Sequence, residues 1–365
     1  MYKILHVITD KNIGGAGVLT LSLLRHTDRT RFAPVVALPC DSLLLPRARA
    51  LGVRVCPLPP SADGTLALAA LPEMLRILWR EKPDLLHTNA ALFARLAALP
   101  FRRMACVDTK HCCFPPSPLQ KSAPARLINR ALERASEVRY ILTAEAARGP
   151  LLLCGSSPSR ATVICGGAER VPRLDEAKKE ALRASLGIPK DAFVVGYAAR
   201  VERGKGHEHL LAAARLLSNR KDIFFLAVGG GSLLPALQKA ARGMKNLVFA
   251  GFRADIGEIM NLFDLNLNLS YLSETSPLSL SEGMSLGIPI VVTRIGGNAA
   301  MAKGCGIVLP PRNPRALADA ILRLADDKSL YTSLSSGARR RYPHYSAPHM
   351  TAKTEALYLW LLKHK

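Results

Sequence analysis

Two glutamates near the start of a predicted helix, Glu274 and Glu282, are the residues best placed for chemistry. Ser276 is a favourable N-cap, and Pro277 is a favourable first helical residue. Glu274 is then expected just before the helix, with Glu282 roughly 8 Å along its axis. Two carboxylates at different positions along the helix axis can bind hydroxyl pairs at the two ends of an elongated ligand. The first helix amides, up to Leu278, would face an anion between them.

A basic loop follows the predicted strand Phe193–Ala198 and precedes a predicted helix. It carries Arg200 and Lys205, two cations that could hold a diphosphate together with the free amides of the helix start. Taken alone, the loop also fits a solvated basic surface, and both interpretations stay open.

Two glycine-rich loops also follow predicted strands. Gly14 and Gly15 belong to the first, where glycines let the backbone approach a ligand and the helix start favours an anion. The spacing is not GxGxxG, as a nicotinamide dinucleotide site would require, and a tight turn without a ligand is the alternative. The second loop, Gly229–Gly231, serves either close packing or a nucleotide base.

No metal site is indicated by the sequence. The eight cysteines show neither CxxC nor zinc-ligand spacing, so we expect reduced, mostly buried thiols. His111 stands beside two cysteines, which is too little for a metal site, and His207 and His209 are interpreted as solvent-exposed. The absence of an Asp-x-Asp motif argues against a metal bridge to a diphosphate.

Short apolar runs alternate with segments of helical period along the whole chain. The runs are continuously apolar, as expected for parallel strands covered on both faces, so the fold class is α/β. The predicted strands are Ile4–Thr9, Ala33–Leu38, Val53–Pro57, Leu85–Thr88, Ala105–Thr109, Val138–Thr143, Thr162–Cys165, Phe193–Ala198, Ile223–Val228, Val248–Gly251, Leu265–Leu269, Ile290–Thr293 and Gly306–Leu309.

A charged stretch near residues 168–190 divides this pattern, and we interpret it as a linker between two doubly wound, Rossmann-like domains. The expected domains are 1–167 on the acceptor side and 168–344 on the donor side, followed by a helix within 345–365 that packs back on the first domain. Because ligands bind beyond the carboxyl ends of such strands, we expect the site in a cleft between the domains.

Composition excludes several classes of protein. The 365 residues are 49% hydrophobic, as in globular proteins, and no apolar window is long enough for a transmembrane helix. The N-terminus lacks a signal-peptide core, so a cytoplasmic location is expected. The net charge of +22 indicates an anionic partner. Aromatic residues make up only 5% and do not interleave with basic ones, which argues against nucleic acid.

These motifs resemble those of the retaining glycosyltransferases of family 4, also called group 1. In the second half, Arg200 with Lys205, then Gly229–Gly231, then Glu274 to Glu282 (an E-x7-E pattern) match in order and spacing. In the first half the resemblance is looser and rests on Gly14-Gly15, on Pro83–Asn89, and on His111 after a strand. The resemblance implies a GT-B architecture, with two Rossmann-like domains facing a central cleft.

The resemblance also implies roles for single residues. Arg200 and Lys205 would stabilise the diphosphate of a nucleotide-sugar donor, with UDP favoured, and no cofactor or metal would be needed. Glu282 would bind the ribose and Glu274 the transferred sugar. His111 would lie near the donor sugar and would be catalytic together with Arg200, Lys205 and Glu274. The donor-binding residues implied in addition to Glu282 are Gly14, Gly15, Ser276, Pro277, Leu278 and Gly229.

The implied activity is sugar transfer to a glycan or lipid-linked acceptor in cell-surface polysaccharide or glycolipid synthesis. A nucleotide-sugar epimerase of the same fold and, less favoured, a basic nucleic-acid-binding protein remain alternatives. Arg126, Arg130 and Arg134 recur every four residues on a basic amphipathic helix. We interpret this helix either as an ordinary solvated surface or as a peripheral contact with anionic lipid on the cytoplasmic face of a membrane.

Overall fold

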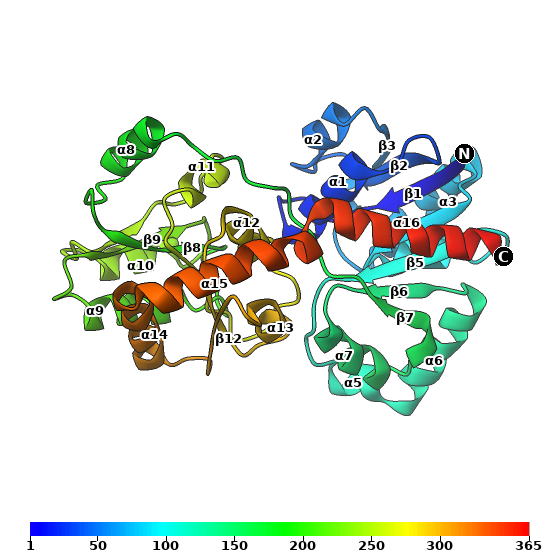
Figure 1. Ribbon diagram of the computed structural model, residues 1–365. Coiled ribbons are helices and arrows are strands. Elements are labelled where there is room, and N and C mark those ends of the chain that lie inside the picture. Colours follow the sequence, from blue (N-terminus) through cyan, green and yellow to red (C-terminus); the bar gives the residue numbers. More distant parts are fainter. Residues whose placement is uncertain (365) are drawn as a thin grey trace. The chain divides into compact units, whose positions relative to one another are not determined.

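The computed structural model describes residues 1–364, which form two compact units. The first unit is Met1–Gly167 together with the C-terminal segment that begins at Ala347, and the second is Ala168–Ser346. Each unit is built around its own parallel sheet (Figure 1).

The sheet of the first unit has the strand order β3-β2-β1-β4-β5-β6-β7, with all neighbours parallel. Successive residues of a strand enter opposite faces: Val35 and Ala37 pack in one apolar core, and Val36 and Leu38 in another. The strands are β1 (Tyr2–Val7), β2 (Phe32–Pro39), β3 (Arg54–Leu58), β4 (Leu85–Asn89), β5 (Ala105–Lys110), β6 (Arg139–Leu142) and β7 (Ala161–Val163).

Helices of the first unit follow its strands along the chain, and short 3-10 turns complete several of the connections. The α-helices are α1 (Gly15–His26), α2 (Leu45–Ala50), α3 (Leu71–Glu81), α4 (Leu92–Ala97), α5 (Pro118–Lys121), α6 (Ala123–Ala135), α7 (Arg148–Leu153) and α16 (Ala347–Lys363), and the 3-10 turns are η1 (Pro60–Ala62), η2 (Leu68–Ala70), η3 (Glu145–Ala147) and η4 (Pro158–Arg160).

The C-terminal helix α16 belongs to the first unit and lies beside α1 (Figure 1). Glu355 on this helix accepts a hydrogen bond from the amide of Asp28 at 2.8 Å. The hydroxyl of Tyr358, also on α16, hydrogen-bonds Nδ1 of His87 on β4. Apart from apolar packing, one buried polar contact therefore joins the last helix to the sheet, and a second joins it to the loop before β2.

The sheet of the second unit has the order β10-β9-β8-β11-β12-β13, again with parallel neighbours. On β9, Phe225 and Ala227 pack in one core, while Phe224 and Leu226 pack in the other, so both faces are covered. The strands are β8 (Phe193–Ala198), β9 (Ile223–Val228), β10 (Leu247–Phe249), β11 (Leu265–Asn268), β12 (Ile290–Thr293) and β13 (Gly306–Leu309).

Eight α-helices and one 3-10 turn surround this second sheet in the described part of the chain. They are α8 (Glu176–Ser185), α9 (His207–Leu216), α10 (Leu234–Ala240), α11 (Ile256–Met260), α12 (Leu278–Leu286), α13 (Asn298–Ala302), α14 (Pro314–Asp326), α15 (Lys328–Arg341) and η5 (Tyr342–Tyr345).

The segment 168–190 is not a linker, because it contains α8 and belongs to the second unit. Asp175 caps α8 by accepting the Lys178 amide at 2.8 Å, and the helix consists largely of strong helix formers. Leu182 and Leu186 then pack against an apolar core of the unit. The high charge of this stretch reflects an exposed helix face.

Two sequence interpretations of side-chain burial were also wrong. His207 is 1% exposed and stacks on Tyr197 with ring centroids 4.6 Å apart, since the first turn of α9 faces the core. The cysteines are free thiols, but only Cys56, Cys106 and Cys305 are buried.

Residues 1–364 contain neither a helix that could span a membrane nor a cluster of metal-binding side chains. No helix there is long and apolar enough to cross a lipid bilayer. Within the same range, no group of three or more histidine, cysteine, aspartate or glutamate side chains has the geometry to hold a metal ion.

Candidate active site

The carboxyl edge of the second sheet brings Lys205 and Glu274 together. Lys205 follows β8 and Glu274 follows β11, and these two strands are hydrogen-bonded neighbours. The Lys205 ammonium forms an ion pair with Oε1 of Glu274, and both side chains are largely shielded from solvent. A cation and a carboxylate predicted from separate motifs are thus one charged pair.

Glycines allow the Lys205 loop to approach the loop after β11. Gly206 has φ +80°, and a Cβ there would lie 2.3 Å from the carbonyl oxygen of Leu269. The carbonyl of Gly204 accepts a hydrogen bond from the amide of Tyr271 at 2.8 Å. The backbone around Lys205 is therefore held by direct contact between the two loops.

Helix α12 begins beside Glu274, but one residue later than predicted. Pro277, not Ser276, is the N-cap, because Pro277 has the extended backbone angle ψ 117° and leaves the helix to start at Leu278. The side chain of Asn266 donates to the carbonyl of Ser279 at 2.7 Å and fixes the first turn to β11. No acceptor among the described residues binds the amides of Leu278 and Ser279, so they remain available to an anion.

Glu282 lies one turn into α12 and is only partly exposed. Burial raises the pKa of its carboxyl to about 7, which makes it the carboxylate of this region that titrates near neutral pH. In the described structure no hydrogen-bond donor or cation satisfies it. A half-buried acid that lacks a protein partner is suited to binding ligand hydroxyls.

Arg200 is exposed at the carboxyl end of β8, and its charge lies near Glu202. Glu202 accepts hydrogen bonds from the amide and the hydroxyl of Ser232, at 2.8 and 2.5 Å, which ties this loop to the glycine loop after β9. Gly229 has φ +151°, and a Cβ there would lie 1.9 Å from the carbonyl oxygen of Ala199. Close packing therefore accounts for a glycine at this position.

In the first unit, Gly14 and Gly15 lie at the start of α1, after β1. Gly14 is the N-cap, and the first turn contains no acidic residue. The carboxylate of Asp10 accepts the Gly17 amide at 3.0 Å, so part of the positive helix end is neutralised within the protein. A Cβ at Gly15 would meet no atom within 4 Å, which leaves open space beside this residue.

His111 follows β5 in the first unit and is partly buried. Its Nε2 lies 2.8 Å from Oδ1 of Asn89, whose own amide donates to the carbonyl of Val7 at 3.0 Å. Because the amide nitrogen of Asn89 faces Val7, its oxygen Oδ1 faces His111 and can only accept a hydrogen bond. Nε2 of His111 therefore carries the proton. Burial lowers the pKa of His111 to about 4, and the imidazole is neutral at physiological pH.

Several residues that support this region were missed by sequence reasoning. They are buried or half-buried side chains that bind the predicted ones, and sequence analysis gave none of them a role, although Asn89 ends the motif Pro83–Asn89. Their shared signal in the chain is position, because each lies at the carboxyl end of a strand or in the loop that follows. They are Asp10, Asn89, Tyr197 and Ser270.

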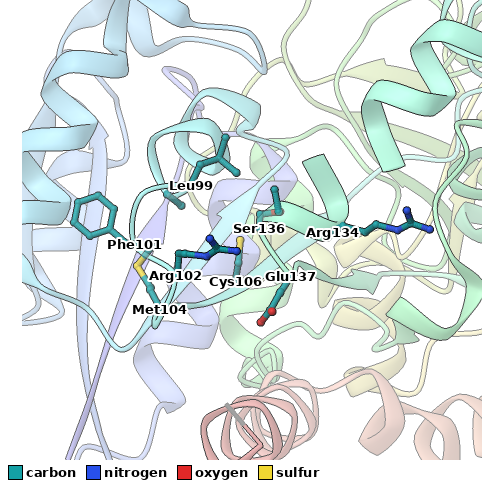
Figure 2. Close-up of a pocket in the computed structure, with 10 residues that line it drawn as sticks. Leu99, Phe101, Arg102, Met104, Cys106, Arg134, Ser136 and Glu137 are labelled. Atoms are coloured by element: carbon teal, nitrogen blue, oxygen red, sulfur yellow. The ribbon is translucent and has the colours of Figure 1, made fainter. Parts of the chain in front are cut away.

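Two pockets that are partly open to solvent lie elsewhere in the structure. One is lined by residues at the end of α6 and before β5, including Phe101, Met104 and Arg134 (Figure 2), and its volume of about 40 Å³ holds little more than water. The other, about 620 Å³, lies near the start of β9 and includes Lys221 and Lys245. Both are at the amino edges of their sheets, opposite the charged loops.

Doubly wound sheets with charged loops and helix starts at their carboxyl edges are typical of α/β proteins that bind phosphorylated ligands. The sequence matches the family described as "Glycosyltransferase Family 4" over residues 13–170 and that described as "Glycosyl transferases group 1" over residues 192–327. The chain belongs to the group 1 glycosyltransferases, also called family 4.

Curated relatives are glycosyltransferases of several specificities. The chain is 26% identical over 284 residues to the UDP-Gal:alpha-D-GlcNAc-diphosphoundecaprenol alpha-1,3-galactosyltransferase of Escherichia coli, covering 72% of each protein. It is 31% identical over 220 residues to a D-inositol 3-phosphate glycosyltransferase of Corynebacterium urealyticum, covering 56% of this chain and 52% of the relative. These relatives do not support the epimerase alternative.

Solved structures share the fold over nearly the whole chain. Anabaena HepE in complex with UDP and glucose superposes with a TM-score of 0.83 at 21% identity, covering 99% of this chain and 100% of HepE. A glycosyltransferase from Rickettsia africae gives a TM-score of 0.85 at 17% identity, covering 100% and 99%. The architecture is therefore GT-B.

Proposed function

We propose that this glycosyltransferase retains anomeric configuration and transfers a hexosyl group from a nucleoside diphosphate sugar to a glycan or lipid-linked acceptor, in cell-surface polysaccharide or glycolipid synthesis. The observation that carries this proposal is the Lys205–Glu274 pair beside the open amides of α12, in a chain of this family. UDP is the favoured nucleotide, since the Escherichia coli relative is named for a UDP-sugar donor and HepE structures contain UDP and UDP-glucose.

The proposed chemistry is charge stabilisation of the leaving group. The bond between the sugar's anomeric carbon and the diphosphate breaks, and its electron pair goes to the phosphate oxygen. Arg200 and Lys205, with the amides at Leu278, stabilise this charge and replace a metal ion. The acceptor hydroxyl oxygen forms the new bond to the anomeric carbon and gives its proton to the departing phosphate.

The remaining roles concern donor recognition. We assign the ribose hydroxyls to Glu282 and the transferred sugar to Glu274 and His111, because paired hydroxyls suit carboxylate and neutral imidazole acceptors. The residues proposed to contact the donor phosphates or base through backbone or small side chains are Gly14, Gly15, Gly229, Ser276, Pro277 and Leu278.

The test replaces the cations singly. Arg200→Ala and Lys205→Ala should each lower kcat/KM with UDP-sugar by at least about tenfold, or about 1.4 kcal/mol, while Lys221→Ala at the opposite sheet edge serves as the control. Activity should persist in excess chelator. Wild-type rates in the double variant would remove these cations from the mechanism, and isomerisation of donor without acceptor would favour an epimerase.

A second part of the proposal concerns peripheral binding to anionic membranes through α6. Arg126, Arg130 and Arg134 are exposed along one side of α6, and Leu127 and Ile128 are 69% and 60% exposed beside them. On the inner side, Glu133 is buried and accepts the amide of Ser157 at 3.1 Å, which anchors the helix. Exposed apolar side chains next to a row of arginines suit the surface of an acidic bilayer, which would also suit a lipid-linked acceptor.

Vesicle sedimentation tests this contact. The wild-type protein should bind vesicles containing acidic lipid, with binding reduced by salt and by changing Arg126, Arg130 and Arg134 to Gln. The charge-matched control changes Lys239, Arg242 and Lys245 in the second unit to Gln and should bind like wild type. Equal binding to neutral vesicles, or none at low salt, would instead indicate a soluble acceptor and an ordinary solvated helix.

A further inference from the structure

Ser270 is a buried serine in the loop after β11, and its hydroxyl binds Glu274. It is 1% exposed, and its Oγ donates to Oε1 of Glu274 at 2.6 Å. This is the same carboxylate oxygen that pairs with the ammonium of Lys205. One oxygen of Glu274 thus receives a neutral donor and a cation together.

The backbone of Ser270 is held on both sides by buried side chains. Its amide donates to Oδ1 of Asn268 at 3.2 Å, and this oxygen also accepts the side-chain amide of Asn298 at 3.2 Å. Its carbonyl accepts a hydrogen bond from the hydroxyl of Thr293 on β12. Asn268, Thr293 and Asn298 are all buried, so these hydrogen bonds hold the backbone of Ser270 in one position. The Ser270 hydroxyl therefore stays in place when a neighbouring side chain moves.

Lys205, in contrast to Ser270, is fixed to the core only through its backbone. Its backbone carbonyl accepts the hydroxyl of Tyr197, a fully buried residue on β8, so the loop position is fixed while the long side chain is not. Burial raises the pKa of Tyr197, so its hydroxyl stays protonated and donates. The Lys205 ammonium carries three donors on a flexible stem and can turn toward another anion.

We infer that Ser270 is a positioning residue that keeps Glu274 in place for the transferred sugar when a diphosphate draws Lys205 away. This inference rests on the proposed function. A carboxylate that loses its cation beside a doubly charged diphosphate would be repelled and poorly solvated. The Ser270 hydrogen bond supplies a donor that does not depend on Lys205, and so preserves the geometry of the acid.

The experiment separates nucleotide binding from transfer. Ser270→Ala should bind UDP with wild-type affinity by calorimetry, because the nucleotide contacts are untouched. With a UDP-sugar its kcat should fall at least about tenfold, with a smaller change in KM. Ser335→Ala is the matched control: Ser335 is also buried, and its hydroxyl donates to the carbonyl of Gly287 at 2.7 Å, away from the charged pair. It should lose similar stability and keep wild-type transfer.

Two results would overturn the inference. Ser270→Ala could transfer sugar at the wild-type rate, as the Ser335→Ala control should, or it could lose UDP affinity together with turnover. If Ser270→Ala does not fold, Ser270→Cys keeps the size of the side chain with a weaker donor and should show the same loss of kcat with intact UDP binding. Failure of the wild-type protein to bind UDP or transfer sugar would instead reject the proposed function itself.

Discussion

His111 and Asn89 form a hydrogen bond that sets which ring nitrogen of the histidine carries its proton. The Nε2–Oδ1 distance is 2.8 Å, and Asn89 is itself oriented by the carbonyl of Val7. His111 is therefore held as a neutral ring of defined orientation at the carboxyl edge of the first sheet. Such a ring can present a fixed hydrogen-bonding atom to a sugar.

Asn89→Ala should lower transfer with a UDP-sugar by about tenfold, because His111 loses the contact that fixes its ring. UDP affinity should stay unchanged, since the imidazole is assigned to the sugar. Asn246→Ala is the control, because Asn246 also donates its amide to a carbonyl, that of Ala214, but at the amino edge of the second sheet. Equal rates for the two variants would contradict the role of His111.

Glu282 should make donor binding dependent on pH. With its pKa at about 7, the carboxylate form, which we propose accepts the ribose hydroxyls, is about tenfold scarcer at pH 6 than at pH 8. Affinity for a UDP-sugar, whose phosphates do not titrate in this range, should rise up to about tenfold over that interval. Glu282→Gln should bind more weakly than wild type at pH 8 and lose the pH dependence.

The same carboxyl gives an independent stability readout in the absence of donor. Its folded pKa is raised above the ordinary value of 4.5, so its contribution to stability is present below pH 4.5 and is lost as pH rises through 7. Glu282→Gln should therefore raise Tm more at pH 8 than at pH 5. If the Tm difference between Glu282→Gln and wild type is the same at pH 5 and pH 8, the carboxyl does not titrate between these two pH values.

The fold could be predicted from the sequence to a large extent. All thirteen predicted strands form, with ends within two residues of the prediction, because strands buried on both faces must be continuously apolar. The segment 168–190 misled the prediction, since an exposed helix such as α8 has the composition of a linker. The N-cap of α12 is Pro277, one residue after the predicted Ser276, because sequence patterns define helix ends only to within one or two residues.

The contacts within the candidate site could not be predicted. Lys205 and Glu274 are 69 residues apart, and they meet because β8 and β11 are neighbours in the sheet, an order that no motif specifies. The roles of Ser270 and Asn89 depend on side-chain directions at strand ends. His207 shows the reverse case: a polar residue at a helix start that the sequence placed in solvent is buried against Tyr197.

Gly15 offers a test of donor binding by the first unit. It is the first residue of α1, its backbone is compatible with any residue, and a Cβ would meet nothing within 4 Å. Gly15→Ala should therefore leave Tm unchanged or slightly raised. If the donor phosphates occupy this open space, the added methyl group should weaken UDP-sugar binding by about tenfold, as calorimetry can show.

Gly149 provides the matched comparison for this substitution. It lies in α7, and a Cβ there would likewise meet nothing within 4 Å. Gly149→Ala should be neutral for both stability and donor binding. Wild-type donor affinity in both variants would remove Gly15, and with it the α1 start, from the donor site.

The buried contact between His87 and Tyr358 should make the first unit sensitive to acid. Burial lowers the pKa of His87 to about 3 and lowers that of His6, whose ring centroid lies 5.3 Å from that of His87. A histidine with a depressed folded pKa contributes stability that is complete above its unfolded value of 6.5. This contribution is lost as pH falls from 6.5 toward 3.

Tyr358→Phe should bring acid unfolding to a higher pH. It leaves a buried nitrogen of His87 without its hydroxyl partner, at a cost of about 1–3 kcal/mol. Both tryptophans of the chain, Trp79 and Trp360, lie in the first unit, so tryptophan fluorescence follows this unit alone. Tyr331→Phe in the second unit is the control and should leave the fluorescence transition unchanged. Identical acid midpoints for the Tyr358 variant and wild type would show that the last helix is held by apolar packing without help from this hydrogen bond.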